Sequence, residues 1–159
     1  SMHPTIRGGF LLGASVAAWT LIMAKSGMYK NPALLYLFWL VIPIQIGILV
    51  AFLRKSAPTS GYGRQVWIGV SISLLGSMLI FANSYYLTTV AYPSYFKDLE
   101  ALGRQMMAAK GMSADQIEAA VKAQAHMQTP RASAMAGAIG TVVTGFLTSV
   151  VAAFWLRKK

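Results

Sequence analysis

Four long apolar segments dominate the chain, at about residues 8–24, 33–53, 65–91 and 132–156. No aspartate, glutamate, lysine, arginine or histidine falls within any of them. A run of about 20 apolar residues is long enough to cross the hydrocarbon core of a bilayer. The first run also fits a cleaved signal peptide, but its apolar character continues through Trp19 and Met23 without a clean cleavage site. The pattern therefore predicts four transmembrane helices.

The last apolar segment carries small residues in two neighbouring rows along one predicted helix. The first row is Ser133, Gly137, Thr141, Gly145, Ser149 and Ala153, and the second is Ala132, Ala136, Gly140, Thr144, Thr148 and Ala152. Membrane helices approach closely at such faces, because small residues let the backbones come together. We predict a helix-packing seam at Gly137, Gly140, Thr141, Thr144 and Gly145. One row would pack within the bundle and the other against a second copy of the chain.

The second and third segments contain polar residues that stand out from their apolar surroundings. Pro43 lacks a backbone N–H and predicts a kink in the second segment, close to Gln45. The far end of the third segment is polar and includes Asn83, Tyr85 and Tyr86. Gln45, Asn83, Tyr85 and Tyr86 are thus candidates for a polar pocket. The alternative is a structural kink with polar side chains that hold helices together.

The segment 94–127 between the third and fourth spans predicts a helical hairpin outside the membrane. Its first half places Phe96, Leu99, Leu102 and Met106 on one helical face, and Gly111 stands where a C-cap is expected. Its second half opens with a capping box, formed by the serine and the glutamine of residues 113–116. All four acidic residues lie in this hairpin. It is therefore the segment in which we expect a partner to bind.

Composition supports one membrane domain, residues 1–159, of the all-α class with four transmembrane helices and this extramembrane hairpin. Only 11% of the residues are charged, although the formal net charge is +10. The basic residues flank the apolar runs, as membrane anchors do, so the charge does not indicate a nucleic-acid partner. The chain has no cysteine, which excludes disulfides, thiolate metal sites and thiol redox chemistry.

The basic residues also predict the orientation of the bundle. A four-span layout places seven lysines and arginines on each side of the membrane. Three of those on the hairpin side, Arg104, Lys110 and Lys122, are far along the hairpin, where charge has less influence on orientation. We therefore expect both termini in the cytoplasm and the hairpin on the other side.

Few residues of the chain are candidates for chemistry. A proton-coupled antiporter needs an ionisable group within the membrane, and the four spans have none. Nucleotide-binding and metalloprotease motifs are also missing. His126 and the neighbouring methionines, Met106, Met107, Met112 and Met127, suit a soft metal such as Cu(I), but methionines more often form an apolar helix face. We predict no catalytic residue, no cofactor and no metal.

Several stretches resemble an uncharacterised family of small bacterial four-span membrane proteins, a domain-of-unknown-function family. They are the opening segment 3–10, the proline-started second span, the hairpin segment 111–117 and the glycine- and threonine-rich segment 140–145. The resemblance covers nearly the whole chain and implies a bacterial inner-membrane location with the same four-helix layout. It implies no activity.

Three function classes follow. The first is a non-enzymatic bundle that binds a membrane protein, a membrane lipid or a second copy of itself as a homodimer. The second is a small carrier or channel-like protein for an uncharged or lipid-like substrate, which would use the Pro43/Gln45 kink and the polar cluster at Asn83. The third is an enzyme acting on lipid headgroups near His126. We favour the first class and keep the carrier as the alternative.

Overall fold

The structure, a computed structural model, describes residues 3–157. This part of the chain forms helices and no strands. The α-helices are α1 (Pro4–Ser26), α2 (Val41–Ser56), α3 (Tyr62–Tyr86), α4 (Tyr95–Ala109), α5 (Ala114–Gln124) and α6 (Pro130–Leu156). Four continuous helical spans are long and apolar enough to cross a membrane: Pro4–Ser26, Leu35–Thr59, Tyr62–Ala91 and Pro130–Leu156. The predicted all-α membrane class is confirmed.

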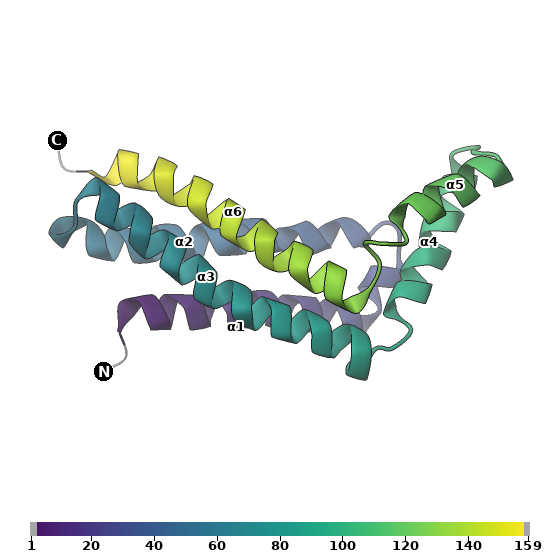
Figure 1. Ribbon diagram of the computed structural model, residues 1–159, viewed down its shortest axis with the longest axis horizontal. Coiled ribbons are helices and arrows are strands. Elements are labelled where there is room, and N and C mark those ends of the chain that lie inside the picture. Colours follow the sequence, from purple (N-terminus) through teal and green to yellow (C-terminus); the bar gives the residue numbers. More distant parts are fainter. Residues whose placement is uncertain (1–2, 158–159) are drawn as a thin grey trace.

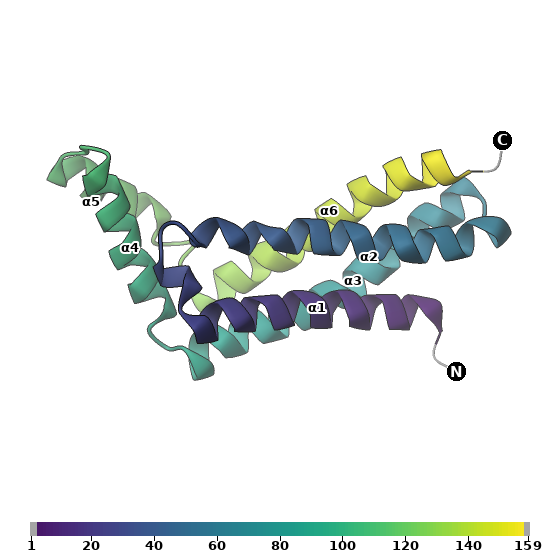
Figure 2. The ribbon, with the colours of Figure 1, turned by 180° about the vertical axis from the view of Figure 1, so that it is seen from behind.

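The four spanning helices form one bundle in which chain order and spatial order differ. The helix α3 packs on α1 and α6, and α2 also packs on α1 and α6, so the order around the bundle is α1, α3, α6, α2. Both ends of the described chain lie at the same end of the bundle, and α4 and α5 lie at the opposite end, inclined to its axis (Figure 1). The view from behind shows α1 and α2 running along the other side (Figure 2). The orientation of these two ends relative to the cytoplasm stays a prediction.

The second span changes helix type along its length. Its first part is a 3-10 helix, η2 (Leu35–Leu40), and the α-helical part begins at Val41. Pro43 lies in the first turn of α2, where a helix does not need the missing N–H. A change of helix type therefore comes just before Pro43, and the kink at this proline stays a prediction.

The third span ends in a wider helical turn. The segment η4 (Leu87–Ala91) is a π-helix, and the amide of Tyr92 donates to the carbonyl of Leu87 over 2.7 Å. A π-turn adds a residue to the helical repeat and so changes which side chains face inward. Leu87 and Thr88 are both buried here, facing the interior of the bundle.

The contact between α3 and α6 is built from two matching glycine–serine pairs. A Cβ on Gly69 would collide with the side chain of Ser149, and a Cβ on Gly145 would collide with that of Ser73. Each serine hydroxyl donates to the carbonyl of the glycine four residues before it, at 3.0 Å for Ser73 and 2.6 Å for Ser149. The serines thus satisfy their polar groups within their own helices. Each glycine provides the space for the serine of the other helix.

A second close contact joins α1 to α3. Gly9 and Gly13 face Leu75 and Leu79, so closely that a Cβ at either glycine would clash with the leucine. In return, Leu12 of α1 packs over Gly76 of α3 and is fully buried. The helix α3 therefore forms close contacts with two partners, and the Gly–Ser contact closes the half of the bundle nearest the termini.

Candidate functional site

The half of the bundle nearest the hairpin contains a cavity of about 440 Å³, which we call the chamber. Its volume falls within the range of ~300–1,000 Å³ that small-molecule sites occupy. All four spans and α4 contribute to its wall. The residues are Val16, Thr20, Met23, Ala24, Tyr29, Leu35, Phe38, Trp39, Val41, Ile80, Asn83, Ser84, Leu87, Thr88, Tyr95, Phe96, Leu99, Ser133, Gly137 and Thr141.

The chamber lies where the small-residue contact between α3 and α6 has ended. That contact uses residues 69–73 of α3 and 145–149 of α6, whereas the wall uses residues 80–88 of α3 and η4 and residues 133–141 of α6. At Gly137 an added Cβ would be 3.8 Å from Ile80, an ordinary van der Waals distance. The helices are therefore pressed together near the termini and further apart near the hairpin, which leaves space between them.

The chamber opens sideways, toward the region that lipid occupies. Of all its wall residues only Phe38, Trp39 and Gly137 are classed as exposed, and they belong to η2 and α6. These two elements are neighbours in the ring because α2, which continues η2, packs beside α6. The indole of Trp19 donates to the carbonyl of Leu37 at 2.8 Å and ties η2 to α1. The gap therefore lies on the α6 side of η2, and we call it the portal.

Aromatic residues and the first half of the hairpin close the chamber at its outer end. Tyr29 and Tyr95 stack with their ring centroids 4.8 Å apart, and Phe96 and Leu99 of α4 lie beside them in the wall. The apolar stripe predicted on this helix thus has a function in the fold, because its first members cover the chamber. The sequence predicts the stripe, but it does not show that the stripe covers a cavity.

A clasp of three residues holds α4 in this position. The hydroxyl of Tyr29 donates to a carboxylate oxygen of Asp98 at 2.9 Å, and the ammonium of Lys30 lies 3.5 Å from the same oxygen. The hydrogen bond from Tyr29, then the one from Ser94 and the charge of Lys30, lower the pKa of Asp98 below its ordinary value. Burial, and then the bond to Asp98, raise the pKa of Tyr29. At neutral pH the clasp is therefore a neutral phenol and a lysine on an ionised carboxylate.

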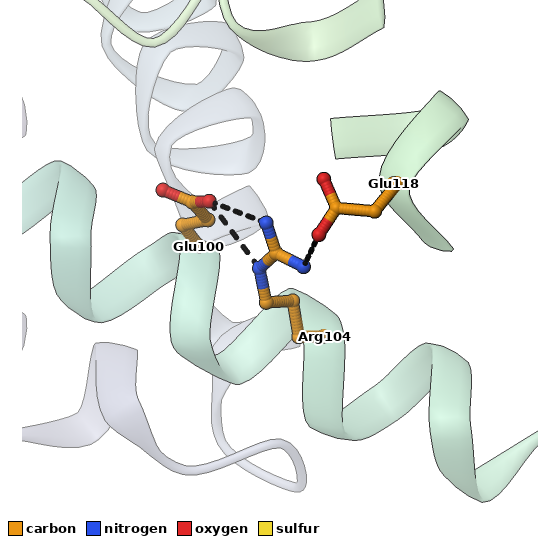
Figure 3. Close-up of polar contacts among 3 residues, drawn as sticks. All are labelled: Glu100, Arg104 and Glu118. Carbon is orange, nitrogen blue, oxygen red and sulfur yellow. Dashed lines mark hydrogen bonds and ion pairs between the residues drawn. The ribbon is translucent and has the colours of Figure 1, made fainter. Parts of the chain in front are cut away.

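The other acidic residues of the hairpin also have structural roles. Arg104 of α4 donates to Glu100 on its own helix at 3.0 Å and to Glu118 of α5 at 2.6 Å, which joins the two helices (Figure 3). Asp115 lies in the first turn of α5, where the helix dipole favours a negative charge. The predicted capping box of Ser113 and Gln116 is formed. The acidic residues are thus used to build the hairpin and hold it on the bundle.

Of the four residues predicted to form a polar pocket, the structure places one in the chamber wall. Asn83 lines the chamber, and its amide donates to the hydroxyl of Thr20 at 3.0 Å. Gln45 is buried outside the wall and donates to the carbonyl of Thr141 at 2.6 Å, joining α2 to α6. Tyr85 and Tyr86 are about half exposed on the outer surface of α3. Gln45 and Asn83 thus hold helices together, and Asn83 also faces the cavity.

The residues of the predicted seam lie in four different environments. Thr141 and Gly145 are buried in the bundle, and Gly137 borders the chamber. Thr144 is half-buried. Gly140 is exposed and has no atom within 4 Å of a built Cβ. The first row of small residues therefore faces inward, and Gly140 of the second row faces away from the helices of its own chain.

The wall of the chamber is suited to binding and offers little for catalysis. It contains no acidic, basic or histidine side chain, and most of its surface is apolar. The hydroxyls of Thr20, Thr88 and Thr141 each donate to a carbonyl of their own helix. No hydrogen bond within the described residues uses the amide oxygen of Asn83, which leaves an acceptor for a ligand. Ser84, Ser133 and Tyr95 also line the wall, and no hydrogen bond within the described residues uses their hydroxyls. The arrangement fits an uncharged, mostly apolar molecule with one or a few polar groups.

The fold and the chamber define an all-α, multi-pass membrane protein with a ligand-sized cavity between its spans. The chain belongs to the family described as "Protein of unknown function (DUF4199)", which matches residues 7–158. This agrees with the resemblance to an uncharacterised family. The comparison with curated proteins gave no match, and the comparison with solved structures gave none either.

Proposed function

We propose that the protein is a non-enzymatic membrane protein that binds an uncharged, lipid-like molecule in the chamber. The observation that carries this proposal is the cavity of about 440 Å³ whose exposed wall residues lie together at the portal. A ligand entering there comes from the bilayer, because the portal lies between two membrane-spanning elements. We place the protein in a bacterial inner membrane, with both termini in the cytoplasm.

The chemistry of the wall supports a neutral ligand over a charged one. Bringing an ion into an apolar cavity is costly unless a counter-charge or several hydrogen bonds await it. The wall has no charged side chain, and its threonine hydroxyls are already bonded to backbone carbonyls. A long-chain alcohol or another lipid with one hydroxyl group fits this wall, with its chain against the apolar surface and its hydroxyl donating to Asn83.

The carrier alternative has less support from the geometry. A carrier must expose its site to each side of the membrane in turn, yet the Gly–Ser contact of α3 and α6 fills the half of the bundle near the termini. The carrier alternative uses Gln45 to bind the substrate, but Gln45 donates a hydrogen bond to the carbonyl of Thr141 and does not line the cavity. Transport would require the closest helix contact of the bundle to separate. Binding alone requires no such movement.

A matched pair of variants on α6 tests the proposal. Ser133 faces the chamber and Ala136 is exposed on the same helix, so Ser133→Phe fills the cavity and Ala136→Phe does not. Delipidated protein would be incubated with hexadecanol and examined by native mass spectrometry and thermal unfolding. We expect a one-to-one adduct and a raised Tm for the wild type and Ala136→Phe, since a ligand that binds only the folded state stabilises it.

The expected result for Ser133→Phe is loss of both the adduct and the shift in Tm. Asn83→Leu provides a second variant that keeps the branched shape and the number of heavy atoms of the side chain but removes the polar group. It should weaken binding of the alcohol roughly fivefold, the effect of one hydrogen bond of about 1 kcal/mol. Equal adducts in all four proteins would mean that the alcohol binds elsewhere, and the proposal would then be wrong.

A further inference from the structure

A second hollow lies at the opposite end of the bundle, on the surface between α2 and α6. It is an open groove of about 480 Å³. Its walls are formed by Ile46, Val50 and Arg54 of α2 and by Leu147, Thr148, Val151, Ala152, Trp155 and Leu156 of α6. It shares no residue with the chamber and plays no part in the function proposed above.

The groove is apolar at one end and polar at the other, as a phospholipid is along its acyl chain and headgroup. From Ile46 to Arg54 it extends over eight residues, or about 12 Å of helix. The deep part has only aliphatic residues and Thr148, whose methyl group is also apolar. The mouth, in the last turns of both helices, has the guanidinium of Arg54 and the indole of Trp155. Tryptophan is typical of the headgroup level of a membrane.

The charge at the mouth is not compensated by the protein. Arg54 forms no ion pair with the residues that the structure describes. All the acidic side chains belong to the hairpin at the opposite end of the bundle, so no aspartate or glutamate competes for this arginine. Arg157 lies over the ring of Phe154, 4.2 Å from its centroid, and adds to the positive charge of this end.

We propose that the groove binds one acyl chain of an anionic phospholipid, with the phosphate of its headgroup on Arg54. The chain would lie against Val50, Leu147 and Val151, and the headgroup beside Trp155. A guanidinium presents paired donors that match phosphate oxygens. Basic pockets between spanning helices are suited to anionic headgroups for the same reason. The ligand is thus of a different class from the neutral molecule assigned to the chamber.

The fluorescence of Trp155 provides the test, because this residue forms part of the groove. A variant in which Trp19, Trp39 and Trp67 are replaced by phenylalanine leaves Trp155 as the one indole. It would be placed in phosphatidylcholine vesicles with a minor fraction of brominated phosphatidylglycerol or, separately, brominated phosphatidylcholine. We expect the brominated anionic lipid to quench Trp155 more strongly, with a relative association constant roughly fivefold higher.

Two arginine variants separate the groove from the general positive charge of this end. Arg54→Gln should abolish the preference, and Arg64→Gln, which removes the same charge from the first turn of α3, should keep it. The same two substitutions would also be made in the chain with all four tryptophans and examined by native mass spectrometry. Arg54→Gln should retain less phosphatidylglycerol than Arg64→Gln and the unsubstituted chain. That measurement decides the question if the single-tryptophan variant does not fold.

Three results would overturn this inference. Equal quenching by the two lipids would mean that the groove holds ordinary bilayer lipid. If Arg54→Gln and Arg64→Gln lost the preference for the anionic lipid equally, the lipid would be attracted by the overall positive charge of this end and not by a site in the groove. A dimer whose Trp155 is shielded from both lipids would mean that a second copy of the chain occupies the groove.

Discussion

At the scale of single residues, the most constrained positions are the glycines and serines between α3 and α6. Gly145 has no room for a Cβ because Ser73 occupies that space, and Ser73 is fully buried. Gly140, five residues earlier on the same helix, has open space around it. Two glycines that look alike in the sequence therefore differ in what they can tolerate.

This difference gives a prediction. Gly145→Ala should lower the free energy of unfolding by ~1–3 kcal/mol, the usual cost of overpacking a close contact. Gly140→Ala should be neutral or stabilise by up to ~1 kcal/mol, since alanine is the better helix former. Unfolding in mixed micelles with increasing dodecyl sulfate, followed by helicity, measures both. Adding Ser73→Gly to Gly145→Ala makes space for the new methyl group and should recover part of the loss.

Equal stability of Gly145→Ala and Gly140→Ala would show that α3 and α6 do not meet at Gly145. These stability measurements do not test the predicted homodimer. That dimer stays a prediction, which rests on the outward position of Gly140 and its neighbours in the second row of small residues.

At the scale of elements, α4 matters because it covers the chamber. Its attachment depends on the clasp of Tyr29, Lys30 and Asp98, and the pKa of Asp98 is lowered in the attached state. A carboxyl whose pKa is lowered in the attached state stabilises that state when the pH is above the ordinary pKa of the group. The contribution is lost as the pH falls through the lowered value. The ordinary pKa of this carboxyl is 3.8, and the lowered pKa lies below that. The clasp should therefore be intact from pH 5 to 8.

Asp98→Asn tests this attachment. It removes the charge that Lys30 and Tyr29 contact, so the amides of α4 should exchange with deuterium roughly tenfold faster, from the loss of one charge-assisted bond. Asp115→Asn makes the same chemical change on α5, away from the bundle, and should leave α4 unaffected. Exchange rates corrected for intrinsic chemistry should not vary with pH between 5 and 8. Unchanged exchange in Asp98→Asn would mean that the clasp does not hold α4 in place.

Sequence periodicity predicted the elements well, for reasons that are local. Four uncharged apolar runs required helices in lipid, and the capping box of Ser113 and Gln116 marked the start of α5. The change from 3-10 to α-helix just before Pro43 was not predicted, because no simple residue pattern in the second span specifies it. The π-turn at Leu87–Ala91 was also missed, since no simple residue pattern specifies it.

At the scale of the whole molecule, the site depends on the order of the helices around the bundle. The sequence suggested Gln45, Asn83, Tyr85 and Tyr86 as one pocket because all four are polar within apolar runs. Asn83 is separated from Tyr85 and Tyr86 by the directions in which these side chains leave α3, and Gln45 is separated from the chamber by the packing of α2 on α6. The ring order α1, α3, α6, α2 depends on contacts between residues far apart in the chain. Asn83 could be predicted from its polarity, whereas Tyr95, Phe96 and Leu99 could not be assigned to the chamber before α4 was placed over it.

The same order explains why one bundle has a closed half and a hollow half. The third span has small residues against α6 near the termini, at Gly69 and Ser73, and larger ones near the hairpin, at Ile80 of α3 and Leu87 of η4. Close contact at one end and larger side chains at the other separate the helices toward the hairpin. A chamber open to lipid on one side is the result, and its use as a binding site is the central claim.

Photolabelling in membranes tests that claim most directly. The probe is a long-chain alcohol with a diazirine at the end of its chain, and the labelled residues would be found by peptide mass spectrometry. The account predicts saturable labelling of chamber residues such as Phe38, Ile80 and Ser133, which excess hexadecanol removes. Labelling that does not saturate and covers outward-facing residues such as Met78, 68% exposed, equally with the chamber would contradict it.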